Sequence, residues 1–247
     1  MLVSTHGIIA QSESGTPPFS NTKSIALDGV DDFVQVADNS NLSFGNGSTD
    51  SPFSISAWIK IGQTTTQGIV SKYGTNNVKR EYLFQITASK IKLTLIASGG
   101  ATNFATGNTA LSLNTWHHVA FTYDGSGGST AYNGIKLYVN GTAETATTGG
   151  SAYTAMTNTV TDVEIGRYSS RELNGAMDEV AIFSSELSQS DITAIYGSGE
   201  PTSLASLSPL SWWRCGDGDT SPTLTDNGSG GNNGTMTNFS TFSTDVP

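Results

Sequence analysis

Acidic side chains in and beside two predicted strands are the residues of this sequence best suited to chemistry. Asp28, Asp31 and Asp32 surround a turn signal, and Asp178 lies in a later apolar strand. Asp32 and Asp178 share strand parity with apolar neighbours, so we expect both on the core side, where an unpaired carboxylate is costly. Calcium prefers carboxylate and carbonyl oxygens. The pattern therefore suggests a calcium site at Asp28, Asp31, Asp32 and Asp178, with hydrogen bonds from turn amides as the alternative.

The arrangement of acids and histidines does not favour catalysis. Glycan hydrolysis needs two carboxyl groups flanking one bond. Asp178 and Glu179 are adjacent, so regular strand geometry would point them to opposite faces. The neighbouring His117 and His118 cannot share one ion through a single strand face, which favours a packed or hydrogen-bonded His118. The sequence thus predicts a protein that is not an enzyme and has no catalytic residues.

Five aromatic and basic residues are candidates for ligand binding. Trp58, Tyr73 and Tyr168 offer rings that could stack on a sugar, and Arg167 and Arg171 flank Tyr168. Trp58 lies on the more polar face of its predicted strand, and the alternative for it is packing beneath a covering loop. For the arginines the alternative is a solvated turn.

The elements that must position these residues are strands. Apolar residues alternate with polar ones over residues 53–61, 81–87, 90–97 and 135–139, and Asp-Gly and Asn-Gly pairs separate such segments. One helix is predicted near residues 188–196, where Ser188 begins a capping box and Gly197 ends the apolar periodicity. These patterns predict an all-β fold, an antiparallel sandwich of the jelly-roll type.

Composition narrows the classes of partner. The 247 residues carry a net charge of −10, which disfavours contact with the phosphate backbone of nucleic acid. No apolar run approaches the ~20 residues of a membrane helix, so no membrane insertion is expected. Cys215 is the single cysteine, so no disulfide within the chain can form. Neutral glycans and cations remain suitable partners.

Several segments in a fixed order resemble one known family. Trp116, His117 and His118 lie in one of them, and Asp178 and Glu179 lie in another. The matching segments are residues 24–34, 53–60, 68–72, 114–125, 135–141, 163–166 and 174–183. Together they resemble the laminin-G-like, concanavalin-A-like lectin/glucanase jelly-roll family. The resemblance implies a sandwich fold, and related modules often carry calcium; the fold also hosts lectins, adhesion modules and structural proteins.

The chain divides into three parts on this view. Residues 1–22 form an N-terminal arm, residues 23–200 the laminin-G-like domain, and residues 201–247 a C-terminal segment. The segment around Trp212 and Trp213 resembles the stretch that usually opens such a domain. We expect residues 212–215 to pair as a strand with the sandwich, as in a circular permutation. The alternatives are a strand given to a neighbouring subunit, a disordered remnant, or the truncated start of a lost second repeat.

The C-terminal residues Asp245, Val246 and Pro247 also resemble the end of virion proteins of marine tailed phages that carry this module. The expected function is therefore a non-catalytic virion structural or surface protein, acting in decoration or adhesion and binding glycan. Such a protein would assemble in the host cytoplasm, without a secretion signal, and would contact other virion proteins or further copies of itself. The alternative is a bacterial extracellular carbohydrate-binding or adhesion module.

Overall fold

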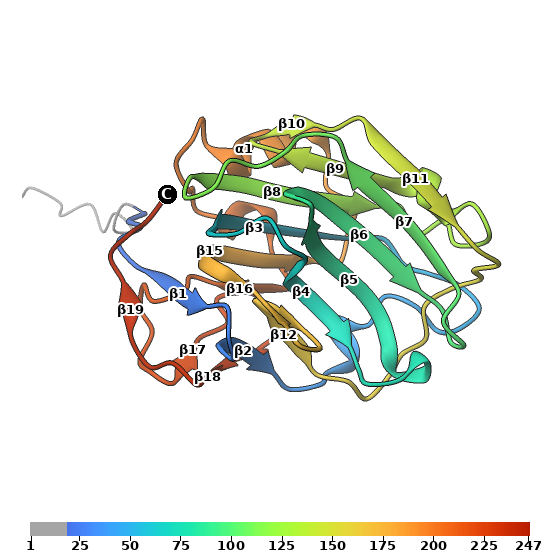
Figure 1. Ribbon diagram of the computed structural model, residues 1–247, viewed down its shortest axis with the longest axis horizontal. Helices are drawn as coiled ribbons and strands as arrows, with labels where there is room; N and C mark the ends of the chain where they lie inside the picture. The colour runs from blue at the N-terminus through green and yellow to red at the C-terminus, as the bar shows by residue number, and fades with distance from the viewer. Residues whose placement is uncertain (1–18) are drawn as a thin grey trace, which may run out of the picture.

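The computed structural model describes residues 19–247, and most of the N-terminal arm proposed for residues 1–22 lies outside the described residues. Two antiparallel sheets face each other, with the strands of the second in front of those of the first in Figure 1. Strands account for 45% of the chain and helices for 9%, as expected for a concanavalin-A-like sandwich. The predicted all-β fold class is confirmed.

The first sheet has eight strands. Its spatial order is β10 (Thr142–Ala143), β9 (Ile135–Val139), β8 (Trp116–Tyr123), β3 (Phe53–Ile61), β15 (Asn174–Phe183), β1 (Ser24–Asp28) and β19 (Phe242–Ser243), with β16 (Ser211–Trp213) paired to β15.

The second sheet has nine strands. Its order is β11 (Ala146–Gly150), β7 (Thr102–Gly107), β6 (Lys90–Ile96), β5 (Arg80–Thr87), β4 (Gln67–Tyr73), β12 (Val163–Ile165), β2 (Phe33–Val36), β18 (Gly234–Thr237) and β17 (Thr223–Leu224). A separate two-stranded hairpin consists of β13 (Arg167–Tyr168) and β14 (Arg171–Glu172).

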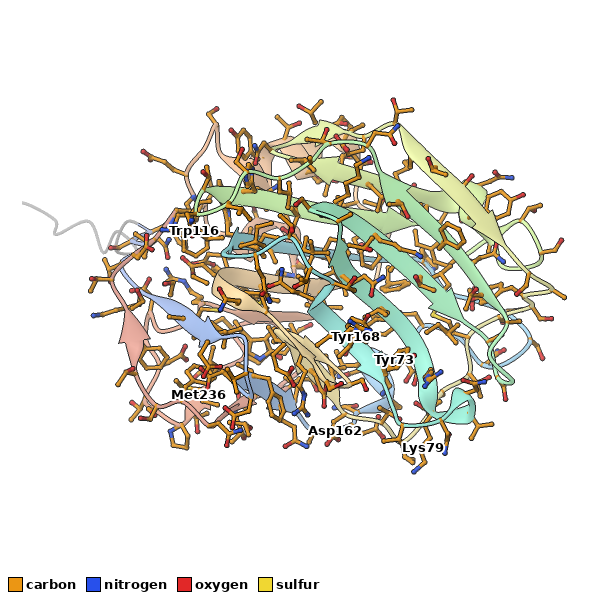
Figure 2. All side chains as sticks on the ribbon, in the orientation of Figure 1. Tyr73, Lys79, Trp116, Asp162, Tyr168 and Met236 are labelled. Carbon is orange, nitrogen blue, oxygen red and sulfur yellow. The ribbon has the colours of Figure 1, made fainter. Side chains whose placement is uncertain are left out.

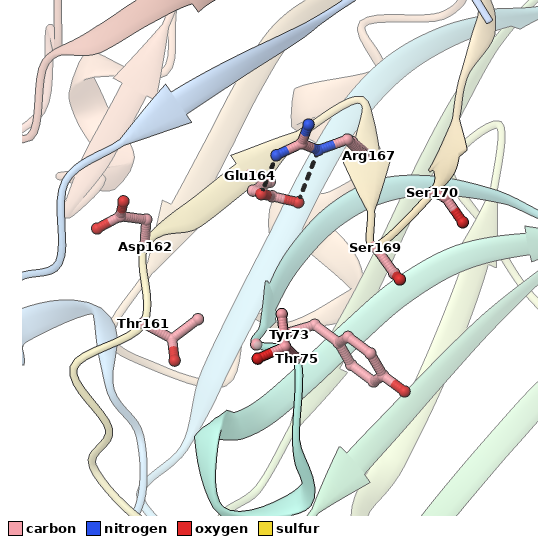
Figure 3. Close-up of a pocket in the computed structure, with 9 residues that line it drawn as sticks. Tyr73, Thr75, Thr161, Asp162, Glu164, Arg167, Ser169 and Ser170 are labelled. Atoms are coloured by element: carbon pink, nitrogen blue, oxygen red, sulfur yellow. Dashed lines mark hydrogen bonds and ion pairs between the residues drawn. The ribbon is translucent and has the colours of Figure 1, made fainter. Parts of the chain in front are cut away.

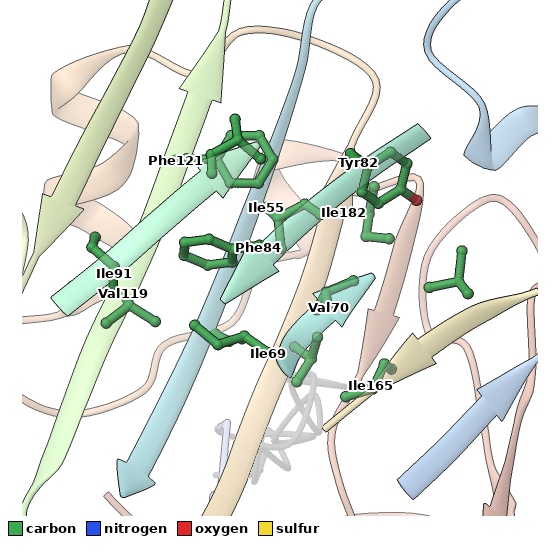
Figure 4. Close-up of a cluster of buried hydrophobic side chains, with 14 of the residues drawn as sticks. Ile55, Ile69, Val70, Tyr82, Phe84, Ile91, Val119, Phe121, Ile165 and Ile182 are labelled. Atoms are coloured by element: carbon green, nitrogen blue, oxygen red, sulfur yellow. The ribbon is translucent and has the colours of Figure 1, made fainter. Parts of the chain in front are cut away.

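Alternating side chains of both sheets form the main core. Ile55 of β3 and Phe121 of β8 meet Phe84 of β5 and Ile91 of β6, and all four are fully buried (Figure 4). The rings of Phe84 and Phe121 pack edge to face with centroids 5.1 Å apart. The sequence alternation that predicted strands at residues 53–61, 81–87 and 90–97 is the alternation that fills the space between the sheets.

Helix α1 (Gln189–Tyr196) covers part of the outer face of the first sheet. Ser188 accepts a hydrogen bond from the backbone of Asp191, whose side chain accepts one in return, and Gly197 ends the helix with a φ of +59°. The helix predicted near residues 188–196 is therefore present, with its predicted caps. Short 3-10 turns lie at Ser40–Leu42, Asn77–Lys79, Ala131–Gly134 and Ala205–Leu207.

The C-terminal segment supplies strands to both sheets of its own chain. β16 pairs with β15, β18 with β2, and β19 with β1, so the last strands lie beside the first ones in Figure 1. Trp213 points between the sheets and is fully buried, whereas Trp212 joins a second apolar cluster with Ile192 and Ile195 of α1. Alternation along one short strand thus places one tryptophan in each apolar cluster.

Candidate functional site

A pocket of about 370 Å³ opens where the β13–β14 hairpin folds over β4 (Figure 3). Its lining residues are Tyr73, Gly74, Thr75, Thr161, Asp162, Glu164, Arg167, Ser169 and Ser170. The hairpin approaches β4 closely at Gly68, where a Cβ atom would lie 2.3 Å from the carbonyl carbon of Arg167. Only glycine at this position lets the hairpin reach the strand and form the pocket wall.

The charge of Arg167 is satisfied inside the site. Its guanidinium donates two hydrogen bonds to the Glu164 carboxylate, one of them 3.1 Å long from Nε, in a bidentate pair. The same group lies 3.2 Å from the centroid of the Phe33 ring. A guanidinium held by a carboxylate and an aromatic face has little capacity left for an anionic ligand.

Two tyrosines form the aromatic side of the site. The rings of Tyr73 and Tyr168 pack edge to face with centroids 5.5 Å apart, and the Arg80 guanidinium lies 4.2 Å from the centroid of Tyr73. Burial raises the pKa of the Tyr168 hydroxyl above its usual value, although the nearby Arg171 acts in the opposite direction. The tyrosines therefore present neutral, partly apolar surfaces with polar ends.

Asp162 lies on the opposite wall from the hairpin. Its carboxylate accepts hydrogen bonds from Gln35 Nε2 at 2.5 Å and from the backbone N–H of Asp38 at 2.9 Å. Thr161 and Thr75 add hydroxyl groups nearby (Figure 3). The pocket thus combines an aromatic ring with short hydroxyl and carboxylate side chains, a set of groups that can hydrogen-bond to sugar hydroxyls.

The structure brings four of the five predicted ligand-binding residues together. Tyr73 and Arg167 line the pocket, Tyr168 contacts Tyr73, and Arg171 pairs with Tyr168 across the hairpin. Figure 2 shows Tyr73, Tyr168 and Asp162 in the same region. Sequence reasoning missed Asp162 and Glu164, although their two-residue spacing, with apolar Val163 and Ile165 alternating beside them, was a usable signal.

Trp58 is not part of this site, and its proposed role as an exposed sugar platform is wrong. The side chain is 3% exposed because α1 covers it. Its ring lies 5.8 Å from that of Tyr196 and 5.5 Å from that of His118. His118 is itself buried and shares a hydrogen bond of 2.8 Å with Ser56, and burial lowers its pKa to about 3. Trp58 is therefore a packed side chain, which was the alternative given for it. His118 is packed and hydrogen-bonded, as the sequence favoured.

Three of the four proposed calcium ligands form one cluster. Carboxylate oxygens of Asp28, Asp31 and Asp32 lie within 4.8 Å of one another in the turn between β1 and β2. Asp32 accepts the backbone N–H of Asp28 at 3.1 Å, and Asp28 accepts that of Val30 at 2.7 Å. Burial, aided by the two neighbouring carboxylates, raises the pKa of Asp32. The carboxylates therefore accept hydrogen bonds from turn amides and also lie close enough together to share a cation.

Asp178 lies apart from this cluster, at an irregularity of β15. The register against β3 shifts between Asp178 and Ala181, and Glu179 adopts a φ of +46°. This bulge interrupts the regular alternation expected from sequence. Asp178 and Glu179 are both buried, as is every residue of β15 from Ala176 to Phe183. A residue other than glycine in this conformation carries backbone strain.

Both terminal segments contact the two buried acids. Asn21 donates a hydrogen bond of 2.8 Å to Asp178, and Trp212 Nε1 donates one of 2.5 Å to Glu179. Arg214 Nε lies 3.2 Å from the other oxygen of Glu179. Burial raises the pKa of Asp178 to about 8 and that of Glu179 to about 7, even though Arg214 lowers the latter.

Over residues 19–247, no helix has the length and apolar character needed to cross a membrane. No curated protein matches the sequence. The fold is similar to that of a putative carbohydrate-binding protein from Bacteroides ovatus, with a TM-score of 0.59 and 19% identity over 89% of this chain. The present chain spans 60% of the length of that structure.

A lower similarity relates the chain to domain 4 of an extracellular arabinanase from Geobacillus stearothermophilus, a structure containing arabinotriose. The TM-score is 0.43, with 20% identity over 60% of this chain and 68% of that one. The family model of the concanavalin A-like lectin/glucanases superfamily, laminin G type, matches residues 28–193. This match covers most of the sandwich, and the chain therefore belongs to the concanavalin A-like lectin/glucanase superfamily.

Proposed function

We propose that the protein is a non-catalytic carbohydrate-binding module that holds a neutral sugar in the pocket beside Tyr73. The observation that carries this proposal is the combination of an aromatic ring, hydroxyl groups and carboxylates around a pocket of about 370 Å³. This volume lies within the range of small-ligand sites. The similarity of the fold to a putative carbohydrate-binding protein is consistent with the same role.

The charges of the site favour a neutral sugar over an acidic one. Arg167 is paired with Glu164, while Asp162 adds negative charge to the opposite wall. The whole chain carries −10. A uronate or sialate would therefore meet repulsion that no unpaired cation of the pocket lining offsets.

The carboxylates of the pocket are engaged in ways that suit binding better than hydrolysis. Glu164 is held by the bidentate contact with Arg167, and Asp162 accepts hydrogen bonds from Gln35 and from the backbone of Asp38. A glycosidase would need one of the two carboxyls to deliver a proton to the leaving oxygen. We therefore expect no release of reducing sugar from polysaccharides that the protein binds.

Replacing Tyr73 by alanine should weaken binding of a neutral oligosaccharide by about tenfold or more, because a central aromatic contact is lost. A glycan array identifies the ligand, and titration calorimetry measures the change in Kd. Trp116→Ala is the matched control, since this aromatic residue lies far from the pocket in Figure 2. Equal affinity of wild type and Tyr73→Ala would place the sugar site elsewhere.

We further propose that Asp28, Asp31 and Asp32 hold a calcium ion. Three carboxylate oxygens within 4.8 Å of one another match the hard oxygen ligands that calcium takes. Calcium at about 100 times its Kd should add about 2.7 kcal/mol to the free energy of unfolding. Melting curves in EDTA and in millimolar calcium measure this shift, and Asp31→Asn should reduce it. Identical curves in the two buffers would exclude the site.

The biological setting that we propose is a virion surface, where the module would decorate the particle or mediate adhesion. Support comes from the resemblance of the C-terminal residues to those of virion proteins of marine tailed phages. Mass spectrometry of purified virions should detect the protein, and light scattering should show self-association. A monomer absent from particles and encoded beside polysaccharide-use genes would favour the bacterial extracellular module instead.

A further inference from the structure

An amine and two carboxyl groups meet at one end of the second sheet, outside the sugar pocket. Lys72 Nζ of β4 lies 2.5 Å from Asp38 Oδ1 and 3.5 Å from Glu81 Oε1 of β5. The side chains of Lys72 and Glu81 are 0% exposed, and that of Asp38 is 28% exposed. A fully buried lysine amine in contact with two acids is rare, because burial of charge is costly.

The two oxygens of Glu81 have different surroundings. Oε1 accepts the N–H and the hydroxyl of Thr159, both at 2.8 Å. Oε2 is buried and has no hydrogen-bond partner among residues 19–247. Burial raises the pKa of this carboxyl, although the positive charge of Lys72 lowers it. Glu81 is thus oriented by one oxygen and left with an unoccupied acceptor on the other.

We propose that Lys72 and Asp38 form an intramolecular amide bond, with Glu81 as the catalytic residue that carries the proton. Glu81 accepts a proton from the Lys72 ammonium, and the neutral amine attacks Cγ of Asp38. A bond forms between Nζ and Cγ, and one Cγ–O bond breaks. Glu81 returns its proton to the departing oxygen. The nitrogen loses a second proton to the same oxygen, which then leaves as water. No oxidant or reductant is required.

The surroundings favour this condensation in two ways. Nζ of Lys72 lies 2.5 Å from Oδ1 of Asp38. The carbon that the amine attacks, Cγ, is bonded to this oxygen, so the two reacting atoms are close to the separation of about 3–3.5 Å at which oriented groups react. The amide that forms is neutral, so the charges of Lys72 and Asp38 no longer have to be kept out of water. Water can leave through the exposed side of Asp38.

The bond would connect two strands that are not neighbours. Asp38 follows β2, Lys72 is the penultimate residue of β4, and β12 lies between these strands in the sheet. The crosslink would therefore clamp three strands next to the pocket, where the backbone of Asp38 also donates to Asp162.

Mass spectrometry of the intact, denatured wild-type protein tests the proposal. The expected mass is lower than the sequence mass by one water molecule. After trypsin, residues 24–60 and 61–79 should remain joined through Asp38 and Lys72, with no cleavage after Lys72. A full sequence mass with separate peptides, measured again after prolonged incubation at neutral pH, would overturn the proposal.

Variants assign the roles. Glu81→Gln keeps an acceptor for Thr159 but cannot carry the proton, and Asp38→Ala removes the acyl group, so both should show the full sequence mass. Circular dichroism establishes that each is folded. Lys60 and Asp245, another lysine–aspartate pair at 2.7 Å but with side chains 26% and 52% exposed, serve as the control within the chain and should stay unlinked. A crosslinked Glu81→Gln protein would refute the role of Glu81.

Discussion

Replacing Trp213 by alanine should lower the free energy of unfolding by about 3–5 kcal/mol, as for other large buried aromatic residues. Trp213 is fully buried between the sheets, and its Nε1 donates a hydrogen bond of 2.9 Å to the carbonyl oxygen of Asn232. The indole thus packs in the core and ties β16 to the loop before β18. For a chain of this length the melting temperature should fall by about 6–20 °C.

The change can be measured by urea unfolding followed through circular dichroism. Val160→Ser is the control, because this side chain is 81% exposed and its replacement should change stability by less than about 0.5 kcal/mol. Trp213→Phe should keep most of the stability that Trp213→Ala loses. Unfolding of Trp213→Ala at the wild-type midpoint would show that the C-terminal segment contributes nothing to the core.

The stability of the protein should fall as pH rises from about 5 to about 8, because of two buried carboxyls. Burial raises the pKa of Asp178 to about 8 and that of Glu179 to about 7. In the unfolded chain both have a pKa near 4, so the folded state binds more protons over this range. Over this range each carboxyl lowers the free energy of unfolding by up to about 1.4 kcal/mol for every pH unit that the pH rises. The contribution of each carboxyl to the free energy of unfolding is complete below about pH 4 and is lost as pH rises through the folded-state pKa values of about 7 and about 8.

Asp178→Asn should flatten this profile. The amide oxygen can still accept the backbone N–H of Glu179, and the amide nitrogen can donate to the buried Oδ1 of Asn21, which has no partner among the described residues. Urea midpoints at pH 5 and pH 8 measure the effect, with the variant gaining most at pH 8. The exposed change Glu200→Gln should follow the wild type. If the stability of wild type and of Asp178→Asn changed with pH in the same way, Asp178 would not be a source of the pH dependence.

The parts of this protein that depend on local periodicity could be predicted from the amino-acid sequence alone. Alternating residues such as Ile55 and Phe84 predicted strands, because successive side chains of a strand point to opposite faces. Ser188 and Gly197 predicted both ends of the helix, because caps satisfy backbone groups within a few residues. The clustering of Asp28, Asp31 and Asp32 also follows from proximity along the chain.

What covers each face of a strand, and which distant segments meet, depends on long-range packing and could not be predicted from the sequence. Trp58 shares a polar strand face yet is buried, because α1 packs over it from more than a hundred residues away in sequence. The bulge at Asp178 and Glu179 adds an extra residue to one strand, which no period of two can reveal.

The sugar pocket and the Lys72 cluster also arise from long-range contacts. The pocket forms where the hairpin containing Arg167 crosses β4, and Lys72, Asp38 and Glu81 come from three separate segments. Strand order and the approach of the hairpin depend on packing free energy summed over the whole sandwich. Residue types therefore identified Tyr73 and Arg167 as candidates, whereas packing placed them together and removed Trp58 from the site.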